Sequence, residues 1–281
     1  MDVKIDYLSA TLMHDPRHGE GEAAQWQSVT AALWEGFPVL TTWLSRQGGW
    51  QPGGARGHYA FSQFHPRLYS AIRYGGSANH VLLEMPGTCC QALRDDEALE
   101  GVLSELAPRL TRCDVAVDIP NGGSPRDFVL AGYNARFKSY AEIVSEAGET
   151  EYVGSMKSER FARVYRYNEP HPRAGVMRVE FVLRSQYAKT LAAEILEHGL
   201  LSAADRLGNT WGWQSPTWQP LKLTDGKLRA SRADRHEPGR VKWIHEVVVP
   251  CLVKAHAEGL IDLAAIIERL QSLSDAASPL R

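Results

Sequence analysis

The sequence lacks the marks of a membrane protein and of a disulfide-rich secreted protein. No stretch approaches the roughly 18 consecutive apolar residues that a membrane span needs. The opening residues, MDVKIDYLSATL, contain no basic region followed by a long apolar stretch, so no signal peptide is predicted. None of the four cysteines stands in a C-x-x-C pair, which argues against a zinc site and a disulfide framework. We therefore expect a cytoplasmic protein without membrane contact.

The chain also lacks the excess of lysine and arginine that usually meets a nucleic-acid backbone, because its formal charge is −2 at pH 7. Two regions, 154–189 and 222–242, are nevertheless basic. The cations of the first are Lys157, Arg160, Arg163, Arg166, Arg173, Arg178, Arg184 and Lys189. Those of the second are Lys222, Lys227, Arg229, Arg232, Arg235, Arg240 and Lys242. Most charge runs are solvated surface, but cations that alternate along a strand, as in the first region, are less easily explained in that way.

What the chain does have is the composition of an ordinary globular protein, with 44% hydrophobic and 23% charged residues among 281. A chain of this length forms one large domain or two small ones, and it buries a large core without disulfides. We find no sequence repeat and no low-complexity tract.

Hydrophobic periodicity divides the chain into strands and helices. Strands are predicted over residues 3–12, 58–64, 68–74, 80–85, 111–119, 151–155, 162–167 and 176–183. Helices are predicted over residues 22–45, with a break at Gly36-Phe37-Pro38, and over 92–110, 124–137 and 185–198. The glycine-rich segment 47–57 is predicted as a loop. The short connections between strands favour an α+β fold, with a central, mainly antiparallel β-sheet flanked by helices.

The character of the sequence changes near residue 200, where we predict a boundary between domains 1–200 and 201–281. The second part opens with three tryptophans, continues with the second basic region, and ends in a small helical C-terminal region over residues 241–256 and 261–273. Tryptophans are more often buried than stacked on nucleic acid. We therefore expect core positions for Trp211, Trp213 and Trp218.

The segment TEYVGSMKSERFARVYRY, residues 150–167, carries the clearest chemical signal. Strand alternation puts Arg163, Tyr165 and Tyr167 on one face and Arg166 on the other. A phenol, with a pKa of about 10, is a poor nucleophile unless its anion is stabilised. Neighbouring guanidinium groups or a metal would stabilise it, and would also neutralise a phosphodiester under attack. Taken alone, the segment is still more often an ordinary half-buried strand.

Several predicted strands also offer a carboxylate, although acids are depleted in strands. Asp114 and Asp118 stand an even number of residues apart, so both face the same side of their strand. Two carboxylates on one face repel each other unless something neutralises them, and a divalent cation is the simplest such group. The other acids within strand patterns are Asp6, Glu84 and Glu180. Such a set suits a metal site on a sheet; the alternative is that each acid faces solvent.

Four motifs in this order resemble the replication initiation factor family of plasmids and filamentous phages, which also includes some conjugative relaxases. The motifs are Ile5-Asp6-Tyr7-Leu8-Ser9, the strand TRCDVAVD from Thr111 to Asp118, the block from Thr150 to Tyr165, and Arg178-Val179-Glu180. Each motif is weak alone, whereas four in order are fairly specific. The match covers the chain from residue 3 to residue 185.

The resemblance implies a DNA nickase that starts rolling-circle replication. Tyr165 would attack one phosphodiester at an origin and become linked to the 5′ phosphate, with Arg163 beside it, and the freed 3′ hydroxyl would prime replication. It also implies acidic ligands for Mg²⁺ or Mn²⁺, which would polarise the phosphate. The ligands implied are Asp114 first, then Glu84 and Glu180, and more weakly Asp118 and Asp6.

The chain departs from the family pattern beside the nucleophile. The family usually has Asp-Lys or Asn-Lys there, whereas this chain has Arg166-Tyr167. Two roles therefore stay open for Tyr167: a second nucleophile, or the nucleophile in place of Tyr165. Met156 stands where the family commonly has arginine. The chain also has no His-x-His pair, with which the better-known nickases hold metal, so carboxylates would have to do so.

The partners implied are origin DNA, as a hairpin or a single-stranded nick site, and the host helicase and replication machinery. Whether the chain forms a homodimer stays open. The DNA-contacting residues expected are Lys157, Arg160, Arg166, Arg178, Lys227, Arg229 and Arg232. Two alternatives are kept: a conjugative or mobilisation relaxase with the same chemistry, and a non-catalytic DNA-binding regulator on the same fold.

Overall fold

A computed structural model describes residues 1–12, 21–78, 80–132, 139–145, 148–168, 171–213, 218, 256 and 262. The chain divides into two compact units, Met1–Ala230 and Ser231–Arg281. All elements below belong to the first unit. The C-terminal helices predicted over 241–256 and 261–273 fall on residues of which the structure describes only 256 and 262.

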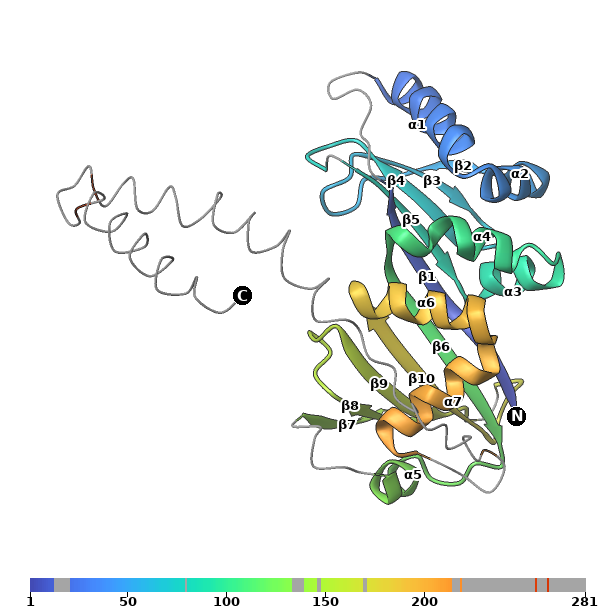
Figure 1. The fold of residues 1–281 in the computed structure, drawn as a ribbon, viewed down its shortest axis with the longest axis vertical. Helices are drawn as coiled ribbons and strands as arrows, with labels where there is room; N and C mark the ends of the chain where they lie inside the picture. The colour runs from blue at the N-terminus through green and yellow to red at the C-terminus, as the bar shows by residue number, and fades with distance from the viewer. Residues whose placement is uncertain are drawn as a thin grey trace, which may run out of the picture. The chain divides into compact units, whose positions relative to one another are not determined.

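Ten strands form a single antiparallel sheet (Figure 1). The strands are β1 (Asp2–Leu12), β2 (Gln51–Gly53), β3 (Phe61–His65), β4 (Ser70–Tyr74), β5 (Val81–Pro86), β6 (Leu110–Pro120), β7 (Tyr140–Ser145), β8 (Gly148–Val153), β9 (Arg160–Arg166) and β10 (Val176–Arg184). Their order across the sheet is β2-β3-β4-β5-β1-β6-β10-β9-β8-β7. The predicted α+β fold with a mainly antiparallel sheet is thereby confirmed.

The helices are α1 (Glu22–Gly36), α2 (Pro38–Gln47), α3 (Gly87–Asp95), α4 (Leu99–Leu106), α5 (Pro125–Gly132), α6 (Gln186–His198) and α7 (Leu200–Trp211). Helices α3, α4, α6 and α7 lie in front of the sheet in Figure 1, whereas α1, α2 and α5 lie near its two ends. The predicted helix break at Phe37 is confirmed, because Pro38 starts α2 at a position where its missing N–H is not needed. Among the described residues, no helix combines the length and apolar character required to cross a membrane.

Some predicted helices and strands differ from those of the structure. The helix predicted over 92–110 is two helices, α3 and α4, because the chain turns at Glu97, whose φ is +56°. Two short strands at the sheet edges, β2 and β7, were not predicted, since all six side chains of β7 are exposed and show no alternation. The helix α7 was also missed. It packs against α6 across the boundary predicted near residue 200.

The two halves of the sheet follow the same path. In each half the first strand, β1 or β6, lies at the centre of the sheet. Four more strands follow in sequence, and the last of them, β5 or β10, pairs with the first. Two helices follow in both cases, α3 and α4 after β5, and α6 and α7 after β10. This repeat is visible only in three dimensions, because the sequence shows none.

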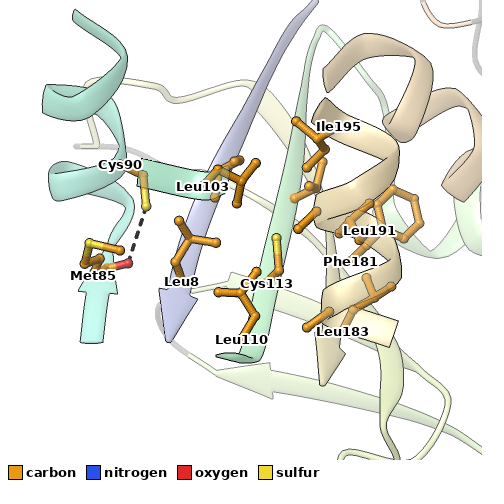
Figure 2. Packing of buried hydrophobic residues seen from close by; sticks show 14 of the residues in the cluster. Leu8, Met85, Cys90, Leu103, Leu110, Cys113, Phe181, Leu183, Leu191 and Ile195 are labelled. Carbon is orange, nitrogen blue, oxygen red and sulfur yellow. Dashed lines mark hydrogen bonds between the residues drawn. The ribbon is translucent and has the colours of Figure 1, made fainter. Parts of the chain in front are cut away.

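The core lies between the central strands and the helices that cover them (Figure 2). Leu8, Cys113 and Phe181 point from β1, β6 and β10 toward Leu103 of α4 and Leu191 of α6, and all five are fully buried. The described cysteines are free and buried, so they act as small apolar residues.

Phe181 of β10 is surrounded by three tryptophans. Its ring centroid lies 5.2 Å from that of Trp211, 5.8 Å from that of Trp213 and 6.3 Å from that of Trp218. The indole N–H of Trp218 donates to Asp205 at 3.0 Å. The prediction that these tryptophans belong to the core is confirmed.

Replacing Phe181 by alanine should lower the free energy of unfolding by about 3–5 kcal/mol, because it leaves a cavity among the tryptophans. Urea unfolding followed by tryptophan fluorescence measures the change. The control is Leu201→Ala on the exposed side of α7, which should cost less than about 0.5 kcal/mol. A Phe181→Ala cost as small as that of the control would contradict the packing.

Candidate active site

The face of the sheet opposite the helices carries a row of charged and tyrosine side chains. We call it the polar row; its members are Arg73, Glu84, Tyr7, Arg112, Asp114, Glu180, Arg163 and Tyr165, on β4, β5, β1, β6, β10 and β9. Side chains alternate between the two faces of a strand, so members of the row lie next to residues that enter the core. Asp114, for example, stands between the core residues Cys113 and Val115.

Asp114 and Glu180 form the centre of the polar row. Both side chains are almost wholly inaccessible to solvent, and each is paired with an arginine. Arg112 Nη2 donates to Asp114 Oδ2 at 2.5 Å, and Arg163 Nη2 donates to Glu180 Oε1 at 2.5 Å. Burial raises the pKa of Asp114 to about 7, although the hydrogen bond from Arg112 opposes the rise.

Tyr165 lies beside this centre. Its hydroxyl donates to Glu180 Oε2 over 3.4 Å, and its backbone pairs with Arg178. Burial and then the charge of Glu180 raise the pKa of Tyr165 well above its ordinary value of 10.0. The resting phenol is therefore neutral, and its proton points toward a carboxylate.

Tyr167 shares the face of Tyr165, as strand alternation predicts. The two rings meet edge-on with their centroids 5.5 Å apart. The ring of His171 stacks on Tyr167 at 4.2 Å and 15°. The guanidinium of Arg178 lies 5.2 Å from the centre of the Tyr167 ring. Tyr167 is thus packed between other planar groups.

Asp118 lies on the same strand face as Asp114 but belongs to a separate ion cluster. It accepts hydrogen bonds from Lys4 at 2.6 Å, from Arg178 at 2.7 Å and from Arg173 at 3.1 Å. Burial opposes its ionisation, but the hydrogen bonds from Arg178 and Lys4 outweigh burial and lower the pKa of Asp118. Asp6 joins this cluster through Arg178 at 2.9 Å.

Glu84 belongs to the other half of the sheet. It accepts a hydrogen bond from the Tyr7 hydroxyl at 2.9 Å and pairs with Arg73. The guanidinium of Arg112 lies 4.5 Å from the centre of the Tyr7 ring, which links this group to Asp114. The polar row therefore contains a tyrosine, a glutamate and an arginine in contact at both ends.

The five carboxylates expected to bind metal do not form one site. They are divided among the pairs and cluster above, and in the described part of the chain no three His, Cys, Asp or Glu side chains gather as a metal site requires. Asp114 and Glu180 are close enough for the charge of one to raise the pKa of the other. Their oxygen donors suit Mg²⁺ or Mn²⁺ in kind. Arg112 and Arg163 already neutralise them, so the arrangement is not a ready-made metal site.

The residues expected to contact DNA are scattered. Lys157 and Arg166 are exposed, at the turn before β9 and at its end. Arg160 lies over the ring of Tyr187 on the helix side, and Arg178 is buried against Asp118. Lys227, Arg229 and Arg232 lie outside the described residues.

Sequence reasoning missed several members of the polar row. Arg112 stands two residues before Asp114, so alternation alone could have put them on one face. Arg73 and Tyr7 reach Glu84 from neighbouring strands, and only the strand register brings the three together.

The raised pKa of Asp114 predicts how stability depends on pH. Between its ordinary value of 3.8 and about 7, the folded chain keeps a proton on Asp114 that the unfolded chain has released. The free energy of unfolding therefore falls as pH rises toward 7, by up to about 1.4 kcal/mol per pH unit from this group. Urea unfolding in chelator from about pH 5 to 8 should show a shallower fall for Asp114→Asn. Equal slopes for the two proteins would contradict the shift.

No family model matches the chain, and no curated protein matches it in sequence. Among solved structures, it is similar to a rolling circle replication initiator protein from Geobacillus stearothermophilus, with a TM-score of 0.53 and 20% sequence identity. The match covers 82% of this chain and 93% of that one. At this identity the likeness concerns the path of the backbone. The chain has the fold of a rolling-circle replication initiator, as the order of its motifs predicted.

Proposed function

We propose that the protein nicks and rejoins one strand of DNA at a replication origin, with Tyr165 as the nucleophile. The observation that carries the proposal is the contact of Tyr165, Glu180 and Arg163 on the polar face of a sheet with an initiator fold. The similarity to an initiator fold supports the role at an origin, and the contact supports a reaction with tyrosine as the nucleophile.

The first requirement of the reaction is a place for the phenol proton. The pKa of Tyr165 is raised, so the proton has to leave while the oxygen attacks. Glu180 Oε2 is the acceptor to which the hydroxyl already points, at 3.4 Å. A hydrogen bond of this length in the free protein is expected to shorten when the substrate binds.

The second requirement is stabilisation of the charge that develops on the phosphate. Arg163 and Arg178 lie beside Tyr165, and arginine presents a planar fork of N–H donors that matches phosphate oxygens. Such prepositioned donors stabilise the transition state most where water is excluded. Both arginines already hold carboxylates, which fixes their positions before DNA arrives.

In the proposed step, the Tyr165 oxygen bonds to phosphorus and its proton passes to Glu180. The bond from phosphorus to the 3′ oxygen breaks, and that oxygen leaves with the electron pair and takes up a proton. The product is a 5′ phosphotyrosine diester and a free 3′ hydroxyl. Rejoining is the reverse, with a 3′ hydroxyl as the attacking group.

The similarity to an initiator fold supports a wider role in replication. Origin DNA would be the substrate and the host helicase and replication machinery the partners, while a relaxase would perform the same chemistry at a transfer origin. The Mg²⁺ or Mn²⁺ requirement stays a prediction, and we route no step through a metal. The alternative of a non-catalytic DNA-binding regulator is motivated by the negative net charge and by the raised pKa of Tyr165.

The nucleophile is tested with a labelled single-stranded oligonucleotide from the origin of the protein's own replicon. Wild type with Mn²⁺ should give a covalent protein–DNA band on a denaturing gel, and Tyr165→Phe should give none, because it lacks the attacking oxygen. Tyr7→Phe is the matched control, since Tyr7 also donates to a glutamate, and should keep the band. A parallel reaction with chelator tests the metal requirement.

Other outcomes are equally informative. Loss of the band only in Tyr167→Phe would move the nucleophile to Tyr167. Absence of a band from wild type, on an origin strand that it binds, would replace the nickase by the non-catalytic regulator.

The role of Glu180 gives a further prediction. Glu180→Gln should slow formation of the covalent band by about 100-fold, because it removes the proton acceptor, and general acid–base groups contribute about 10²–10⁴. Glu84→Gln on the other half of the sheet is the control and should change the rate little. Equal slowing by both variants would point to a shared role, such as metal binding.

A further inference from the structure

A cavity of about 700 Å³ opens next to the two tyrosines. One wall is the turn between β9 and β10, with Tyr167 and His171, and the opposite wall is α3, with Thr88, Gln91 and Asp95. Lys4 and Asp6 of β1 also border it. Tyr167 lies in edge-on contact with Tyr165, so the cavity begins one ring away from the proposed nucleophile.

The first wall is an aromatic platform that is already assembled. The imidazole of His171 stacks on Tyr167, and its Nδ1 accepts a hydrogen bond from the backbone N–H of Arg173 at 3.1 Å. These two contacts fix the ring, yet His171 remains exposed. A ring that is held in place and accessible can stack a further planar group at little cost in conformational entropy.

The opposite wall is one face of a helix. Thr88, Gln91 and Asp95 stand three to four residues apart on α3, so their polar side chains project on the same side. Gln91 Nε2 donates to Asp95 Oδ1 at 2.7 Å, which orders both side chains. Gly87 lets α3 start close to β1, because a Cβ there would lie 2.9 Å from Asp6 Oδ1. A shift in the β1 register between Ile5 and Tyr7 occurs at Asp6.

The charges of the cavity are balanced. Its cations Lys4, Arg173 and Arg178 all bind Asp118, and Arg178 also binds Asp6. With Asp95 on the other wall, the cavity carries no net positive charge. An exposed aromatic platform facing uncharged and acidic hydrogen-bonding groups instead suits a flat, polar, neutral ring, which is the chemistry of a nucleobase.

We infer that this cavity binds one unpaired nucleobase of the strand next to the phosphodiester that Tyr165 attacks, with His171 and Tyr167 as the stacking platform. This rests on the proposed function and deepens it. Tyr167 then serves as a positioning residue for the strand, and the hydrogen-bonding groups of α3 face the edge of the base.

The test measures equilibrium binding of the full-length Tyr165→Phe protein, which forms no covalent band. The probe is the fluorescein-labelled origin strand, intact or with one nucleotide at a time replaced by an abasic residue, and the readout is anisotropy. His171→Ala and Gln91→Ala are added singly from the two walls. His198→Ala is the matched control, because it removes an exposed histidine from α6.

His171→Ala should weaken binding of the intact strand about tenfold, as loss of one stacked base does. At one position of the strand only, the abasic residue should weaken binding of the Tyr165→Phe protein about tenfold. At that position it should not weaken binding of the His171→Ala protein any further. Gln91→Ala should reduce the abasic effect at that same position, and His198→Ala should change nothing. Additive losses at every position, or a His171→Ala protein that binds as the control does, would overturn the inference.

The two proposals fail in different ways. If one position shows the effect but wild type gives no covalent band, the base pocket stands and the nickase proposal fails. If wild type gives a covalent band but the losses of binding from the abasic residue and from His171→Ala are additive at every position, the nickase proposal stands and the pocket fails. A single coupled position far from the mapped nick would keep a base site and overturn its place beside Tyr165.

Discussion

The buried carboxylate of Asp118 is the constraint on which the candidate site depends. It stands on a central strand and draws in Lys4 from β1, Arg178 from β10 and Arg173 from the turn between β9 and β10. A buried charge is tolerated only when it is paired and hydrogen-bonded, so these cations cannot move independently of it. Through Arg178 and the turn, this one carboxylate fixes where Tyr167 and His171 lie.

The same rule explains the rest of the polar row. Asp114 and Glu180 are buried and close together, and each is neutralised by an arginine of its own. Burial nevertheless raises the pKa of Asp114 to about 7, although the hydrogen bond from Arg112 opposes the rise. Tyr165 donates to the second oxygen of Glu180, which keeps the phenol protonated but gives its proton an acceptor. The site is therefore a network of balanced charges that a phosphate would have to enter.

The repeated path of the two half-sheets shows why one half is the better candidate. Both halves bring a tyrosine, a glutamate and an arginine into contact on the polar face. In the described part of the chain, Tyr165 is followed on the same face by a second tyrosine, Tyr167, which borders a cavity with α3. The difference lies in the turn after β9, which carries His171 and Arg173 toward Asp118 and Tyr167.

The sequence by itself determined the fold class, most strands, the helix break at Phe37 and the buried tryptophans, because local periodicity and apolar composition carry these. Alternation also put Arg163, Tyr165 and Tyr167 on one face, since it depends on a single strand. What only the tertiary structure decided is which charges meet. The partners Arg73–Glu84, Lys4–Asp118 and Arg163–Glu180 come from different strands, and strand order and register are set by the packing of the whole sheet. For that reason five carboxylates that looked like one metal set in the sequence are divided among arginines and a lysine in the fold.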